Sequence, residues 1–490
     1  MVSALLSSSP TPAAPTKRKL VLLFLGTSIL SIFLFNHLHL ALDWTGIRGL
    51  SSQCNNHGSL QHHNDPSTSE IGEGKTSSLS RLDEDDLCSS APSGRNLMIS
   101  FKMGASRMHY LLPTHLLTLA RCATTNQLLI SSDRDEIYAG HIVHDVLKNV
   151  SRDWKEMHED FETYRMLEKY RTGGLRLETL YGTSGWLLDK WKYIPIALLA
   201  HALAPAHVEW FVFLEDDAAV SWTNLVAWLA TLDPSQPRYI GRVFPVINST
   251  LTFAHGGSGY VISRPGLERL VKARETEGAE AYDRRWENYT STSCCGDIVT
   301  GAVMEEAGVV VEKSGGVLQM ETLNTITFTN ETWCQTPATQ HHVDAYQIND
   351  LWRFQTAWVR KHGWHIPYTW SDLFRELAHE NIKSPRKEWY NWREDIQYFA
   401  SANESVWDSY DDVQKASVKS AENCAEACDH EVECLQWRWI SGRCFLGTEL
   451  VYGVASEQGA EFWMSGWHLE RVERRMEEWG YCRGGGGYGK

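Results

Sequence analysis

Three adjacent carboxylates, Glu215, Asp216 and Asp217, stand directly after a run of large apolar residues over 210–214. Such a run predicts a buried parallel strand. Acids at the carboxyl end of this kind of strand lie where open α/β sheets bind ligands. Because close carboxylates repel one another, they favour a divalent cation, which together with substrate phosphates is how proteins hold a nucleoside diphosphate. The competing interpretation is a solvated acidic turn.

A second segment, over 253–260, contains three glycines, Gly256, Gly257 and Gly259. Glycine is typical of positions where the backbone must approach another group closely. An ordinary tight turn would have the same composition. The segment therefore predicts either a turn alone or a turn that lines a ligand cleft.

Asp297 precedes an apolar stretch over 298–306 that predicts a helix. There the carboxylate serves either as an N-cap or as a general base that faces a cleft. His341 and His342 lie in a polar segment and are either exposed surface residues or a source of one metal ligand. Neither signal is specific by itself.

The elements that would position these residues alternate between strand and helix. The sequence predicts strands over 96–101, 127–132, 210–214, 239–243, 260–263 and 308–312, and helices over 110–121, 187–203 and 298–306. This alternation favours an α/β domain built on a parallel sheet. Lys102 and Asp133 follow the first two strands, where a nucleotide would bind, although each could be a solvated loop charge. Residues 345–400 are predicted as helices that close the same domain.

In this order, the segments over 96–352 resemble glycosyltransferase family 31, which includes the fringe enzymes and the core 1 β1,3-galactosyltransferase. The residues that carry the resemblance are Lys102-Met103-Gly104 with Leu112-Pro113-X-His115-Leu116, Ser132-Asp133, Gly185-Trp186-X2-Asp189-Lys190-Trp191-Lys192, Glu215-Asp216-Asp217, Phe253-Ala254-X-Gly256-Gly257-X-Gly259-Tyr260 and Gly296-Asp297-Ile298-X2-Gly301.

The resemblance implies a GT-A fold, which is a Rossmann-like α/β sandwich, over 94–400. It also implies Mn2+ or another divalent cation and a UDP-sugar donor. Asp217 would be the main metal carboxylate, with support from Glu215 and Asp216. His342, or else His341, would be the other protein ligand.

The same resemblance makes Asp297 the catalytic base. It places the Gly256 and Gly257 turn along the cleft for donor and acceptor. The residues expected to face the uridine diphosphate are Lys102, Asp133, Lys192 and Asp216.

Three positions depart from the family pattern. Glu215 begins the acidic triplet where relatives have Asp, which lengthens one arm by a methylene. Ala218 stands where many relatives have a polar residue. Gly296 replaces an acid beside Asp297, so the base would lack a negative neighbour and have a lower pKa than in relatives.

The implied reaction is a single inverting displacement. A hexose or N-acetylhexosamine would pass from the UDP-sugar to a hydroxyl of a glycan or glycoprotein, with a β1,3 linkage. The alternative is a catalytically inactive, membrane-anchored protein that binds carbohydrate on a transferase scaffold. A metal-dependent hydrolase that uses the three acids is a third class.

A second module is predicted over 402–482, where four cysteines have the spacing Cys424-X3-Cys428-X5-Cys434-X9-Cys444. It resembles a PAN/Apple domain, a small disulfide-bonded α+β module. The resemblance implies disulfides between Cys424 and Cys444 and between Cys428 and Cys434. Its role would be to bind glycan or protein, or only to stabilise the enzyme.

The N-terminal residues predict the compartment. The basic residues 17–19 end a short cytoplasmic tail over 1–19, and an apolar run over 20–42 follows. This pattern favours an uncleaved signal anchor over a cleaved signal peptide, and it places everything after residue 43 in the lumen. The family resemblance favours the Golgi membrane. A flexible stem is predicted over 43–93 and a flexible tail over 483–490.

Composition agrees with a lumenal body. The 490 residues include 11 cysteines, and five glycosylation sequons begin at Asn149, Asn248, Asn288, Asn330 and Asn403. The odd cysteine count leaves at least one thiol for an intermolecular bond, and we expect Cys54 or Cys88 to link a dimer through the stem. The net charge of −15 argues against nucleic acid as a partner.

Overall fold

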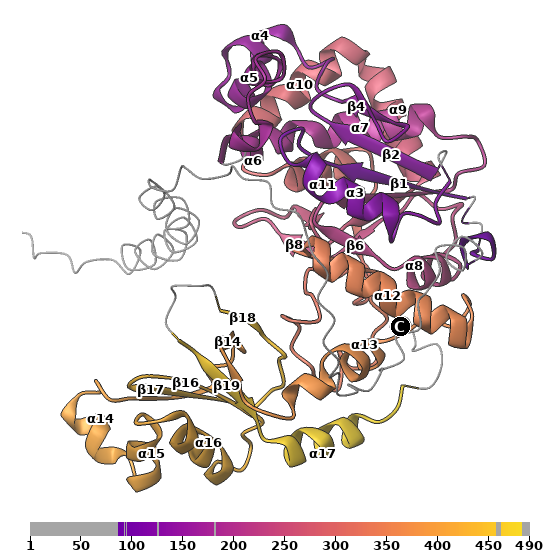
Figure 1. Ribbon diagram of the computed structural model, residues 1–490. Coiled ribbons are helices and arrows are strands. Elements are labelled where there is room, and N and C mark those ends of the chain that lie inside the picture. The colour runs from indigo at the N-terminus through magenta and orange to yellow at the C-terminus, as the bar shows by residue number, and fades with distance from the viewer. Residues whose placement is uncertain are drawn as a thin grey trace, which may run out of the picture. The chain divides into compact units, whose positions relative to one another are not determined.

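The computed structural model describes residues 87–482, apart from 93, 95, 125–126, 181–182 and 457–461 (Figure 1). The predicted cytoplasmic tail, membrane anchor, C-terminal tail and all but the end of the stem lie outside these residues, and so does Cys54. Within the described part of the chain, no helix combines the length and the apolar character needed to cross a membrane.

A mixed sheet of eight strands forms the centre of the first domain, in the order β11-β7-β10-β5-β1-β2-β4-β3. Its strands are β1 (Leu97–Lys102), β2 (Leu128–Ser132), β3 (Glu136–Tyr138), β4 (His141–Asp145), β5 (Trp210–Glu215), β7 (Tyr239–Gly241), β10 (Tyr260–Ser263) and β11 (Val311–Lys313). β1 lies parallel to β2 and β5, whereas β10 is antiparallel to β5 and β7. The predicted parallel sheet is therefore mixed: β10 is antiparallel to both of its neighbours, and the edge strand β3 is antiparallel to β4.

The sheet is buried on both faces because its apolar side chains alternate between them. In β5, Val212 and Leu214 enter one core, while Phe211 and Phe213 enter the other. The second core is closed by α7 (Tyr193–Leu203), α9 (Arg264–Glu277), α10 (Ala279–Thr292) and α11 (Gly296–Glu306). The first is closed by α3 (Met108–Leu117), α8 (Trp222–Leu229), α12 (Ala345–His362) and α13 (Trp370–Leu377).

The helix predicted over 187–203 is divided in the structure. α6 (Thr183–Asp189) and α7 are separated by a 3-10 turn over Lys190–Lys192. The strand predicted over 239–243 also divides, because β8 (Val243–Pro245) leaves the sheet to pair with β9 (Thr252–Ala254).

The predicted helical end of the first domain, over 345–400, is helical only in its first part. β13 (Arg386–Lys387) and β15 (Ile396–Phe399) are edge strands of the C-terminal sheet, whose order is β13-β19-β16-β17-β15. Segments of two and four residues among many tryptophans and arginines carry too little periodicity to predict a strand.

The other strands of this sheet are β16 (Gln436–Ile440), β17 (Arg443–Gly447) and β19 (Met464–Trp467), and α16 (Ala421–His430) packs against it. Disulfides join Cys424 to Cys444 and Cys428 to Cys434. Both predicted pairings are confirmed.

The two parts of the chain share one core. Val472 and Met476 of α17 (Leu469–Trp479) belong to the same apolar cluster as the first face of the large sheet. A disulfide joins Cys334 to Cys482 across 148 residues of sequence. The backbone N–H of Phe328 donates to the carbonyl of Leu450 at 2.8 Å.

Cys88 forms a disulfide with Cys122. The prediction that Cys88 links two chains is therefore wrong, because its sulfur is already bonded within the chain. Leu87 beside it is buried in the first core, so packing begins before the predicted domain start at residue 94. The free cysteines within the described ranges are Cys294 and Cys295.

Candidate functional site

A pair of short strands brings the histidines to the acidic triplet. β6 (Ala218–Val220) follows Asp217 directly and pairs with β12 (Thr339–His341) so that His341 lies opposite Ala218. The antiparallel register places His341 and the following His342 beside Asp217. Residues far apart in sequence thus form one group.

This group has the composition of a metal site. Asp217 Oδ1 lies 3.4 Å from His341 Nε2, and Asp217 Oδ2 lies 3.6 Å from His342 Nδ1. One ligand atom from each of the three residues lies within 4.8 Å of the others. His341 is 6% exposed, whereas the side chain of His342 is 72% exposed. Both histidines are placed to contribute, so the preference for His342 stays a prediction.

The electrostatics of Asp217 suit a cation. Burial raises the pKa of Asp217, but its contacts with His341 and His342 outweigh burial and hold that pKa well below the usual range. The carboxylate is therefore ionised. Its Oδ1 atom is buried and makes no hydrogen bond within the described part of the chain, which is an arrangement that a bound cation would satisfy.

Asp216 has a different environment. Its carboxylate lies 3.5 Å from Arg107, which also reaches Asp217 at 3.7 Å. Burial raises the pKa of Asp216 to about 7. Its backbone carbonyl accepts a 2.6 Å hydrogen bond from His115 Nε2, and burial lowers the pKa of His115 to about 4, so this imidazole is neutral and donates.

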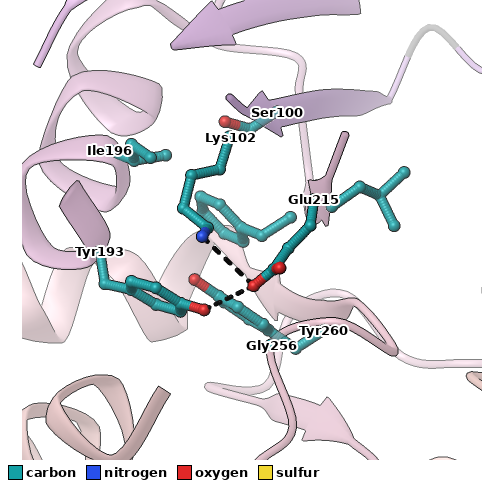
Figure 2. Close-up of a pocket in the computed structure, with 9 residues that line it drawn as sticks. Ser100, Lys102, Tyr193, Ile196, Glu215, Gly256 and Tyr260 are labelled. Carbon is teal, nitrogen blue, oxygen red and sulfur yellow. Dashed lines mark hydrogen bonds and ion pairs between the residues drawn. The ribbon is translucent and has the colours of Figure 1, made fainter. Parts of the chain in front are cut away.

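Glu215 points away from the histidines. Its Oε1 atom accepts a 2.8 Å hydrogen bond from the Tyr193 hydroxyl and lies 3.3 Å from Lys102 Nζ (Figure 2). Lys102 in turn contacts Asp189 at 2.9 Å, and Asp189 contacts Lys192 at 2.7 Å. Glu215 is not part of the group around Asp217, and its metal role stays a prediction.

The network ends at Asp133. Its Oδ2 atom lies 3.6 Å from Lys192, and its Oδ1 atom accepts from the Ala105 N–H at 2.5 Å. Lys102, Asp133 and Lys192 are all buried. The structure thus brings together three of the four residues predicted to face the nucleotide, and Asp189 joins them in one network of paired charges, as burial requires.

Asp297 lies in the first turn of α11, but the N-cap position belongs to Cys295. The capping interpretation of Asp297 is therefore wrong. Asp297 Oδ2 accepts a 3.2 Å hydrogen bond from the Gly256 N–H. Burial, and then the charge of Glu215, raise the pKa of Asp297 above its ordinary value. Although Gly296 supplies no acid, Asp297 therefore has a negative neighbour.

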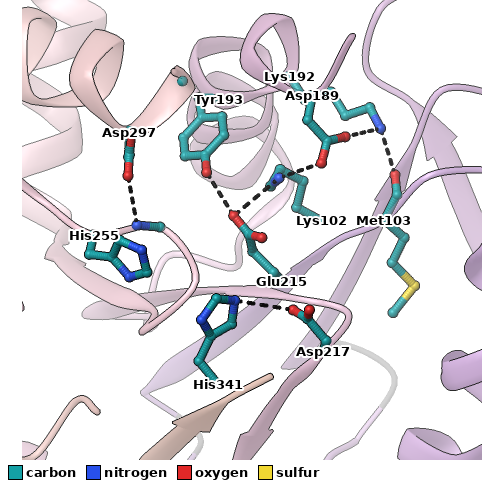
Figure 3. Close-up of polar contacts among 12 residues, drawn as sticks. Lys102, Met103, Asp189, Lys192, Tyr193, Glu215, Asp217, His255, Asp297 and His341 are labelled. Atoms are coloured by element: carbon teal, nitrogen blue, oxygen red, sulfur yellow. Dashed lines mark hydrogen bonds and ion pairs between the residues drawn. The ribbon is translucent and has the colours of Figure 1, made fainter. Parts of the chain in front are cut away.

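The glycine turn joins the base to the metal group (Figure 3). A Cβ at Gly257 would lie 2.2 Å from the His341 ring, and a Cβ at Gly256 would lie 2.2 Å from the Tyr193 hydroxyl oxygen. Only glycine permits this approach. Contacts therefore run without a break from Asp297 through Gly256 and Gly257 to His341 and then to Asp217.

Four residues of the site were assigned no role from the sequence. Arg107 contacts the Asp216 carboxylate and Tyr193 donates to the Glu215 carboxylate, while His115 donates to the Asp216 backbone carbonyl and Asp189 pairs with Lys192. Three of them lie inside or directly beside a family motif, and Arg107 lies three residues after one. In the sequence, these four residues are marked only by their nearness to a family motif, and that nearness does not reveal which atom a side chain contacts.

Comparison with known proteins agrees with the resemblance. The family described as Fringe-like matches residues 195–351. Over 135 residues, 27% of this chain, the sequence is 32% identical to glycoprotein-N-acetylgalactosamine 3-beta-galactosyltransferase 1 of Xenopus laevis. The match spans about a third of that relative, 34% of its length. The resemblance to glycosyltransferase family 31 is thus confirmed for this part of the chain, and the mixed α/β sheet fits a GT-A-like fold.

Proposed function

We propose that the chain is an inverting glycosyltransferase that moves a hexose or N-acetylhexosamine from a UDP-sugar to a glycan or glycoprotein hydroxyl. A β1,3 linkage is proposed because the relative's name states a 3-beta transfer. The observation that carries the proposal is the unbroken set of contacts from Asp297 to Asp217. A single displacement needs a base for the acceptor hydroxyl and positive charge at the leaving diphosphate, and here one glycine turn connects the two sites.

Asp217, His341 and His342 would hold a divalent cation, with Mn2+ proposed from the family. When bound, the cation would neutralise charge on the diphosphate. The mixture of one carboxylate and two imidazoles is compatible with several divalent ions. Arg107 adds positive charge beside the carboxylates of Asp216 and Asp217.

Asp297 would take the proton from the acceptor hydroxyl. Its carboxylate is fixed by hydrogen bonds from the backbone N–H groups of Gly256 and Ile298. Two donors to one carboxylate orient it before the substrate arrives. A raised pKa makes Asp297 a better proton acceptor than an exposed Asp.

The test is a screen of purified lumenal protein against UDP-sugars with Mn2+, with thermal shift first and transfer to glycan acceptors second. We expect one donor to stabilise the protein only in the presence of metal and to release UDP slowly without acceptor. A protein that binds glycans and neither binds nor hydrolyses any UDP-sugar would support the inactive carbohydrate-binding alternative instead.

We also propose a lumenal location behind an N-terminal anchor, in the Golgi. All five sequon asparagines are exposed, so each is accessible to a glycan. A loss of apparent mass after treatment of the cellular protein with an N-glycosidase would support this location, and an unchanged mass would contradict it. A dimer linked through Cys54 would separate under reducing conditions.

A further inference from the structure

We propose that Tyr193 is a positioning residue that ties the acidic triplet to the helix of the base, a role that rests on the proposed function. Tyr193 begins α7 and is 6% exposed. Its hydroxyl donates to Glu215 at 2.8 Å, and Lys102 Nζ lies 4.8 Å from the centre of its ring (Figure 2).

The ring of Tyr193 occupies the space beside Gly296. A Cβ at Gly296 would lie 2.2 Å from Tyr193 Cδ2 and 2.8 Å from the Lys190 Cα. An acid at position 296 therefore cannot coexist with Tyr193 in this arrangement. Gly296 and Tyr193 therefore depend on each other, because the tyrosine ring fills the space that a side chain at position 296 would need.

Glu215 is the third residue of this packing arrangement, and its length matters for the contact with Tyr193. Replacing Glu by Asp shortens the side chain by one C–C bond of about 1.5 Å. From its present 2.8 Å, the carboxylate would then lie beyond hydrogen-bond distance of the Tyr193 hydroxyl unless the backbone moved. Two departures from the family pattern, at 215 and 296, thus meet at one side chain.

The geometry gives Tyr193 contacts with three parts of the site. Its hydroxyl holds the end of β5 through Glu215, its ring packs against the start of α11 at Gly296, and its oxygen contacts the turn at Gly256. The end of β5 leads to Asp217, which is the proposed cation ligand, the start of α11 carries the proposed base Asp297, and the glycine turn lies between them. Their separation determines how the acceptor hydroxyl meets the sugar, and misplacement by about 1 Å is costly in rate.

The kinetic test is Tyr193→Phe, assayed with the donor that the UDP-sugar screen identifies. We expect kcat to fall by about 10-fold or more while KM for the donor changes less than about 3-fold, because positioning affects the reacting geometry more than binding. The matched control is Tyr398→Phe, which removes the hydroxyl of a buried tyrosine in the C-terminal module. An unchanged kcat, or an equal loss in the control, would overturn the proposal.

A second measurement needs no activity. Thermal unfolding of Gly256→Ala, Tyr193→Phe and the double variant measures their coupling. The new methyl group collides with the tyrosine oxygen, so we expect Gly256→Ala alone to lower Tm by more than about 3 °C and the double variant to recover part of the loss. Additive shifts would reject the contact. If the wild type transfers no sugar, the proposed function fails. Non-additive shifts in Tm would still support the contact between Tyr193 and the turn at Gly256.

Discussion

The three neighbouring acids illustrate how side-chain surroundings divide chemical roles. Glu215 is held by Tyr193 and Lys102, Asp216 faces Arg107, and Asp217 lies between two histidines. The pKa of Asp216 is raised to about 7, whereas that of Asp217 is lowered far below its usual range. A sequence shows three carboxylates, but only the packed structure separates the cation ligand from its supports.

Replacement of Asp297 by Asn should remove transfer without removing donor binding. The amide cannot accept the acceptor's proton, so we expect kcat to fall about 10²–10⁴-fold. Calorimetry should give an unchanged affinity for UDP with Mn2+. Near-normal turnover in a folded Asp297→Asn protein would show that the base lies elsewhere.

Transfer should depend on pH through the same residue. Because the pKa of Asp297 is raised above 3.8, its base form is lost at a higher pH than for an exposed Asp as the pH falls. We expect kcat/KM to decline on the acidic side with an apparent pKa above 3.8, measured at saturating Mn2+ so that the cation ligands stay ionised. Circular dichroism at each pH separates this from unfolding, and a profile flat down to pH 4 would contradict it.

Asp217→Ala should abolish the metal-dependent part of UDP binding. The variant removes the carboxylate between the two imidazoles, and two imidazoles alone hold Mn2+ weakly. Calorimetry with and without Mn2+ measures the effect. Asp233→Ala is the control, because Asp233 is exposed and accepts hydrogen bonds from the backbone N–H and the hydroxyl of the nearby Ser235. Equal Mn2+ dependence in both variants would remove Asp217 from the cation site.

At the scale of elements, long apolar runs made the fold predictable. β1, β2, β5 and β10 match their predicted ranges to within one residue because each is apolar and bounded by polar residues. The break between α6 and α7 was not predicted. Lys192 in this turn donates to the Met103 carbonyl, a tertiary contact that the local sequence does not encode. The pairing of β6 with β12 was equally hidden, because three-residue strands have no readable period.

The sequence predicted the main residues of the site but not every contact between them. Asp217, Asp297 and both histidines were named from the sequence, and the structure brings them together. The hydrogen bond between Tyr193 and Glu215 depends on how α7 packs against β5, which no local pattern encodes.

The role of the glycine turn before β10 in metal binding can be tested by substitution. Gly257→Ala would place a methyl group 2.2 Å from the His341 ring, so the imidazole or the turn must shift. We expect Mn2+ affinity to fall at least about 10-fold, as when the geometry of a metal ligand is disturbed. Gly185→Ala is the control, because a Cβ there meets nothing within 4 Å. Unchanged Mn2+ binding in Gly257→Ala would show that His341 is dispensable.

At the scale of the whole molecule, the C-terminal module is not a detachable appendage. Its Leu450, Trp467 and Val472 are part of the apolar core that covers the large sheet. Of the two roles predicted for the module, stabilising the enzyme has this direct contact in its favour. Deleting the module would expose that core, so glycan binding by the module is better tested with surface substitutions than with truncation.

The disulfide between Cys334 and Cys482 should contribute strongly to stability, because it closes a loop of 148 residues. We expect Cys334→Ser with Cys482→Ser to lower the free energy of unfolding by about 2–5 kcal/mol. Urea denaturation of the glycosylated protein measures this. Cys294→Ser, which removes an exposed free thiol, is the control. A double variant as stable as this control would show that the bond is dispensable.

The placement of Trp333 has a consequence for biosynthesis. Its indole packs on Trp479 and donates to the carbonyl of Gly480, so part of the core around Trp333 is completed by residues that are synthesised much later. Until they are synthesised, the nascent chain exposes aromatic surface of the kind that makes folding intermediates prone to aggregate. Complete folding of this core therefore waits for the translation of α17.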